Sequence, residues 1–91
     1  MPSMNDWEIE NQRQRARDLL SMIIVTINEK LDKEEEKPEE ARNRDRITSL
    51  TEQALIYRKK RKSMFRVPDS ELVALNDALS RKLEEIDRED G

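Results

Sequence analysis

The chain has 91 residues, of which 43% are charged and 34% hydrophobic, with a formal net charge of −3. A chain of this length and polarity forms at most one small domain with a thin core. It has no cysteine and no histidine. This excludes disulfide bonds and metal sites built from those two residue types, and removes the commonest general base. We therefore expect one small helical domain over residues 1–91, with no metal and no cofactor.

Glycine is almost absent, since the only one is Gly91 at the end of the sequence. Tight turns between strands need glycine, whereas glutamate, lysine, arginine and leucine are good helix formers. The composition therefore predicts an all-α fold. Pro38 and Pro68 divide the chain into three segments, because proline interrupts a helix. We expect one helix in each segment, over about residues 5–35, 40–65 and 69–88.

The first predicted helix contains the longest apolar stretch, from Leu19 to Ile27. Three of its residues, Met22, Ile24 and Val25, lie outside the main apolar stripe, so the middle of the helix is apolar on all sides and is expected to be covered on more than one side. The β-branched run 23–27 also fits a strand, but its helix-like flanks favour a helix. At about 100° per residue the main stripe consists of Ile9, Ala16, Leu19, Leu20, Ile23, Ile27 and Leu31.

An acidic connector is expected around residues 33–40. The residue before a proline disfavours the helical region, so the first helix is predicted to end at or before Lys37. In the second helix the apolar residues alternate spacings of three and four, as in a coiled-coil seam, with Arg61 in the middle of that face. The apolar members of the face are Ile47, Leu50, Ala54, Tyr57, Met64 and Phe65.

The third predicted helix begins after Pro68, where Asp69, Ser70 and Glu71 suit a helix N-terminus. Its apolar stripe is only about 80° wide, so it packs into one groove and leaves the rest of the helix in water. The stripe consists of Leu72, Leu75, Leu79, Leu83 and Ile86. We expect the second and third helices to pack on a long, central first helix, with frayed ends over residues 1–5 and 88–91.

The charges are segregated along the chain. Residues 47–66 contain six basic and one acidic side chain, whereas residues 67–91 contain three basic and eight acidic ones. Such cations neutralise phosphates, which makes them candidate phosphate or nucleic-acid contacts. They also suit a helix C-terminus, the chain's own acidic segments or a protein partner, and these alternatives stay open. The candidate contacts on the outward side of the second helix are Arg58, Lys59, Lys62 and Arg66.

No catalytic pattern is present, because the sequence has no glycine-rich phosphate loop, no Ser-His-Asp set and no metal-ligand spacing. We therefore expect no enzyme and no small-molecule substrate. No stretch approaches the ~20 apolar residues that cross a bilayer, and the N-terminus lacks the basic and apolar regions of a secretory signal. We expect a soluble, cytoplasmic protein that does not insert into membranes.

The first helix has more apolar surface than the other two helices can cover, and this is the main indication of function. The second and third helices each offer one apolar stripe, which together cover the main stripe but leave Met22, Ile24 and Val25. A second copy or a partner protein is the simplest cover for these three residues. We expect a small regulatory or adaptor module acting as a helical homodimer, with a nucleic-acid accessory role as the alternative. A closed three-helix bundle and an open or swapped dimer both fit the pattern.

Overall fold

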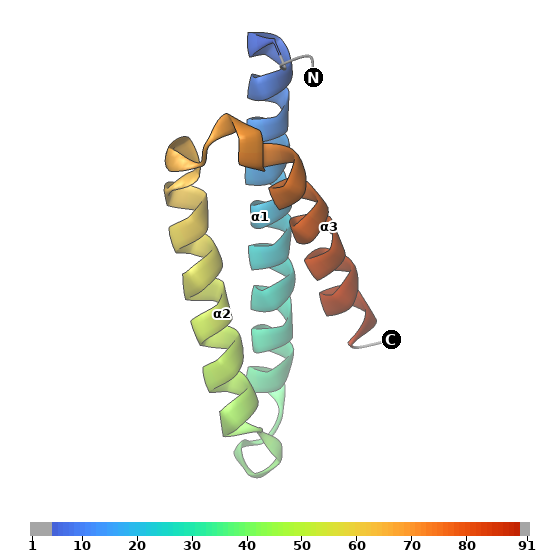
Figure 1. Ribbon diagram of the computed structural model, residues 1–91. Helices are drawn as coiled ribbons and strands as arrows, with labels where there is room; N and C mark the ends of the chain where they lie inside the picture. The colour runs from blue at the N-terminus through green and yellow to red at the C-terminus, as the bar shows by residue number, and fades with distance from the viewer. Residues whose placement is uncertain (1–4, 90–91) are drawn as a thin grey trace.

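The structure is a computed structural model that describes residues 5–89 (Figure 1). The described residues form three α-helices joined by short 3₁₀ turns, without a strand, which confirms the predicted all-α fold. The frayed ends expected at residues 1–5 and 88–91 lie mostly outside this range. The helices are α1 (Asp6–Glu36), α2 (Arg44–Lys62) and α3 (Leu72–Arg88).

Helix α1 is the longest element, with 31 residues, and at 1.5 Å per residue it is about 46 Å long. Its N-terminus is capped by Asn5, whose side chain accepts a hydrogen bond from the Glu8 amide at 2.8 Å. It ends at Glu36, because Lys37 takes an extended conformation before Pro38. The connector therefore lies further along the chain than predicted, since residues 33–36 still belong to α1 and α2 begins only at Arg44.

Helix α2 is shorter than the predicted range 40–65 at both ends. Residues Glu39–Ala41 form a separate 3₁₀ turn, and α2 starts only after Asn43, whose side chain accepts from the Arg46 amide at 3.0 Å. At the other end the Ser63 amide donates to the Lys59 and Lys60 carbonyls at 3.1 Å. The chain then tightens into a 3₁₀ turn, Met64–Arg66. The break changes the direction in which the next side chains point.

Phe65 shows the effect of this break. The periodicity placed Phe65 with Met64 on the apolar face, but Met64 is 1% exposed and Phe65 is 67% exposed. The 3₁₀ turn rotates each residue further than an α-helix does, so only one of the two neighbours keeps facing α1. The guanidinium of Arg66 lies over the Phe65 ring, 5.2 Å from its centroid. Phe65 therefore contributes surface and not core.

Helices α2 and α3 lie on either side of α1 in the view of Figure 1, and both pack against it to form the hydrophobic core. Among the described residues, the backbones of α2 and α3 seldom approach each other, whereas both pack closely on α1. Buried side chains of all three helices form one core cluster, and beside it a groove between α2 and α3 is open to solvent. The buried core residues are Ala16, Leu20, Ile23, Ile27, Leu50, Ala54, Met64, Leu72, Leu79 and Ile86.

A buried arginine holds the connection between α2 and α3 against α1. Arg13 donates to the carbonyl oxygens of Met64 at 2.5 Å and Val67 at 3.1 Å. Its other terminal nitrogen pairs with Asp69 Oδ1 at 2.6 Å. Charge-assisted bonds of this kind are stronger than neutral ones. Arg13 therefore ties the connector between α2 and α3 to α1.

The opposite end of α1 is held by a buried carboxylate. Glu34 accepts a hydrogen bond from Lys37 Nζ at 2.8 Å and another from the Asn43 amide at 2.7 Å. The bond from Lys37, and then that from the Asn43 amide, hold the pKa of Glu34 below its usual value. The bond to Asn43 spans nine residues and joins α1 directly to the N-cap of α2. This link fixes the end of the hairpin that lies far from Arg13.

Candidate binding surfaces

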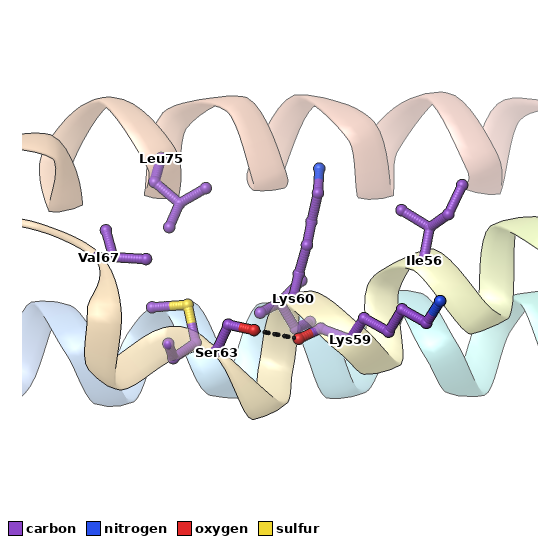
Figure 2. A pocket seen from close by; sticks show the side chains of 8 residues that line it. Ile56, Lys59, Lys60, Ser63, Val67 and Leu75 are labelled. Atoms are coloured by element: carbon purple, nitrogen blue, oxygen red, sulfur yellow. Dashed lines mark hydrogen bonds between the residues drawn. The ribbon is translucent and has the colours of Figure 1, made fainter.

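An open groove of about 420 Å³ lies between α2 and α3, over α1 (Figure 2). Its surface is almost entirely apolar. The groove exists because α2 and α3 each pack on α1 and hardly meet each other. We call it the interhelical groove. It is lined by Leu20 of α1, by Ile56, Lys59, Lys60, Ser63, Met64 and Val67 from α2 and the connector, and by Leu75 of α3.

The walls of the interhelical groove carry apolar side chains that face one another. In Figure 2, Ile56 extends from α2 toward α3, while Leu75 extends from α3 toward α2, with Val67 beside it. Ile56 is 51% exposed, although isoleucine is usually buried. Lys60 also extends toward α3, and its ammonium lies 5.4 Å from the Tyr57 ring centroid. The groove therefore offers apolar contact with cations at its edge.

A second hollow, of about 780 Å³, lies on the other flank of α2 and is strongly basic. Arg17 reaches it from α1, and the apolar side chains of Ile24 and Leu55 also line it. Leu55 is 51% exposed. No acidic side chain contributes to the lining. We call this the basic hollow, and its α2 cations are Arg58, Lys59, Arg61 and Lys62.

The structure brings together three of the four predicted phosphate contacts, namely Arg58, Lys59 and Lys62. Arg66 is not among the residues that line the basic hollow, because α2 ends at Lys62 and Arg66 belongs to the following 3₁₀ turn. Arg17 and Arg61 join the hollow instead. The sequence placed Arg61 on the apolar face, and Arg17 could be assigned only once the packing of α1 on α2 was known.

The cations of the basic hollow form no ion pair with the acidic segments of the chain within residues 5–89. Two acidic residues of α3 pair with basic residues of the same helix. Glu85 lies 3.8 Å from Lys82, and Glu84 lies 3.9 Å from Arg88. Of the alternatives that the sequence left open, pairing with the chain's own acidic segments is therefore not what the fold uses. The positive charge of α2 remains exposed to solvent.

The outer face of α1, away from α2 and α3, carries two of the three predicted interface residues. Met22 is 52% exposed and Val25 is 55% exposed. Ile24 differs from the expectation, because it is only 8% exposed. It lies on the edge of α1 that α2 overlaps, where it lines the basic hollow. The uncovered apolar surface of α1 is therefore Met22 and Val25, together with Trp7, which is 73% exposed.

No group of three or more acidic side chains in the described part of the chain is arranged to hold a metal ion. Within residues 5–89, none of the helices combines the length and the apolar character that spanning a bilayer requires. Comparison with protein-family models, with curated proteins and with solved structures gives no match. The indications of function therefore lie in the surfaces of the molecule.

Proposed function

We propose that the chain is a small, non-catalytic, cytoplasmic interaction module, an adaptor or regulator, whose interhelical groove binds an apolar helical segment of another protein. The observation that carries this proposal is the groove itself. It gathers apolar side chains from all three helices, and it leaves Ile56 half-exposed. Amphipathic helices bind in grooves of this kind by placing residues spaced three and four apart against the apolar walls.

The charge at the edge of the groove indicates the chemistry of the partner. Lys59 and Lys60 both line it, and no acidic side chain does. An incoming helix with acidic residues beside its apolar face would meet both cations. Such complementarity favours association and disfavours basic partners. We therefore propose an acidic, amphipathic helix as the occupant.

Replacing Ile56 by glutamate places a negative charge in the apolar wall and is expected to reduce capture of the partner at least tenfold. The new carboxylate removes an apolar contact, must lose water when the partner binds, and repels the acidic side chains of the proposed helix. The measurement is affinity capture of the tagged chain from cells that produce it, with quantitative mass spectrometry. Proteins that bind the groove will be depleted with Ile56→Glu relative to the unsubstituted chain.

The matched control is Val73→Glu. Val73 is 49% exposed, almost the same as Ile56, but it lies on α3 and does not line the groove. The control variant introduces the same charge at an exposed apolar position and is expected to retain the partner. If both variants retain the same proteins, or both lose them, the groove is not the binding site.

A second candidate function is contact with a nucleic-acid backbone through the basic hollow. The observation that favours it is the convergence of cations from two helices, without an acidic neighbour or an ion pair within residues 5–89. Lysines and arginines so placed bind phosphates in a manner that depends on salt and not on base sequence. This candidate uses a different flank of α2 from the interhelical groove, although Lys59 lines both.

Changing Arg58, Arg61 and Lys62 to glutamate is expected to abolish binding to a labelled DNA or RNA duplex. Fluorescence anisotropy at ~50 mM salt measures this, because phosphate contacts are strongest at low salt. The control makes the same three charge reversals at Arg81, Lys82 and Arg88 of α3. If the unsubstituted chain binds no duplex at this salt concentration, or if the control loses as much binding, the nucleic-acid function is ruled out.

Self-association belongs to the same proposal. The exposed Met22 and Val25 lie on the outer face of α1, so a second copy could cover them without closing the interhelical groove. A homodimer of this kind would present two grooves to partners. The exposure of Met22 and Val25 supports the homodimeric adaptor that the sequence predicts.

A further inference from the structure

Three exposed residues of α1 form a straight stripe on its outer face. Arg15, Met22 and Glu29 are spaced seven residues apart, which is close to two full helical turns, so they point in nearly the same direction. Met22 is half-exposed, and the other two are exposed. Neither Arg15 nor Glu29 has an ion pair within residues 5–89. The stripe is therefore basic at one end, apolar in the middle and acidic at the other.

A stripe with this order of charges is complementary to a copy of itself turned end for end. We propose that two copies of the chain pair through the outer faces of α1, antiparallel, with the two-fold axis at Met22. Met22 then contacts Met22 of the second copy. Arg15 of each copy lies opposite Glu29 of the other, so the same ion pair forms twice by symmetry. A parallel pair would instead place Arg15 against Arg15 and Glu29 against Glu29, which like-charge repulsion disfavours.

The outer face of α1 has shallow hollows that suit such packing. One shallow hollow of about 520 Å³ lies on the N-terminal side of Met22, and its lining includes Asp18 and Leu19. Another of about 290 Å³ lies on the C-terminal side and is lined by Ser21, Met22, Val25 and Thr26. Side chains of one helix that enter hollows of the other are the basis of close helix pairing. In the proposed register Asp18 faces no acidic side chain of the second copy, because Val25 and Thr26 lie opposite it.

The inference rests on the homodimer proposed above but not on the interhelical groove. The chain has no native cysteine, so Met22→Cys introduces a single thiol at the proposed two-fold axis. Under mild oxidation at micromolar concentration, Met22→Cys is expected to form at least tenfold more disulfide-linked dimer than Arg15→Cys. In an antiparallel pair the two introduced thiols of Arg15→Cys lie on the order of 20 Å apart, too far to bond. Val73→Cys on α3 is the control for random collision.

Charge reversal tests the ion pairs separately. Arg15→Glu is expected to raise the dimer dissociation constant about tenfold in sedimentation equilibrium, since two attractions become two repulsions. Combining Arg15→Glu with Glu29→Arg in one chain is expected to restore the dissociation constant of the unsubstituted dimer. A monomer throughout the micromolar range would overturn both the homodimer and this surface. A dimer that Met22→Cys cross-links no better than Val73→Cys would overturn this surface alone. Neither result bears on the groove, which Ile56→Glu tests independently.

Discussion

Replacing Ile23 by alanine is expected to lower the free energy of unfolding by about 3 kcal/mol, as buried large-to-small substitutions do. Ile23 is 0% exposed and belongs to the core cluster that α1 forms with both other helices. Small domains are stable by only about 5–15 kcal/mol in total, so this is a large fraction. Urea unfolding followed by circular dichroism at 222 nm, a wavelength that reports helix, measures the change.

The control for this prediction makes the same substitution at an exposed position. Ile56→Ala removes the same atoms from a side chain that is 51% exposed. It is expected to cost less than about 1 kcal/mol, because half of that surface is already in water. If the two variants lose the same stability in the purified protein, Ile23 is not at the centre of the core.

Replacing Arg13 by methionine is expected to lower the free energy of unfolding by about 2–3 kcal/mol. The substitution keeps a long apolar side chain but leaves the Met64 and Val67 carbonyls without the bonds that Arg13 donates. It also leaves Asp69 without its partner. An unsatisfied polar group costs about 1–3 kcal/mol when it is buried. Asp69 is exposed, so the loss of its partner costs less than the loss at the two carbonyls. Urea unfolding measures the loss, and amide hydrogen exchange in the first turn of α3 is expected to rise.

Two further variants distinguish the role of Arg13 from a general effect of charge. Arg88→Met removes an exposed arginine that pairs with Glu84 and is expected to change stability by less than about 0.5 kcal/mol. Arg13→Lys keeps the charge but cannot form the same fork of bonds, so an intermediate loss is expected. Equal stability of Arg13→Met and Arg88→Met would show that the connector does not depend on Arg13.

Much of the fold was predictable from local signals. Pro38 ended α1 where the sequence placed its end, and the residues at positions 16, 20, 23 and 27 became buried as their spacing indicated. The third helix begins at Leu72, after a 3₁₀ turn at Asp69–Glu71, and it buries Leu72, Leu79 and Ile86 of its predicted stripe. These features depend on the chemistry of a few neighbouring residues and on helical periodicity, so they can be predicted without knowledge of the tertiary structure.

The candidate surfaces were only partly predictable. Met22 and Val25 are exposed, as their position outside the main stripe indicated, whereas Ile24 is covered by α2. The interhelical groove was not predicted. Ile56 could have indicated it, because this apolar residue lies outside the predicted apolar face of the second helix. A signal for Arg13 was also present, since position 13 continues the spacing of Ile9, Ala16 and Leu20. A charged residue at such a position needs a buried partner.

Local sequence was enough to predict the all-α class, the breaks at the prolines and the segregation of charge that makes the end of α2 basic. The packing of the helices was needed to learn which cations gather in the basic hollow, that Phe65 is exposed, and that α2 and α3 leave a groove between them. The difference comes from the range of the forces involved. Helix formation and capping are local, whereas the covering of Ile24 and the convergence of Arg17 with Arg58 depend on how two distant helices pack.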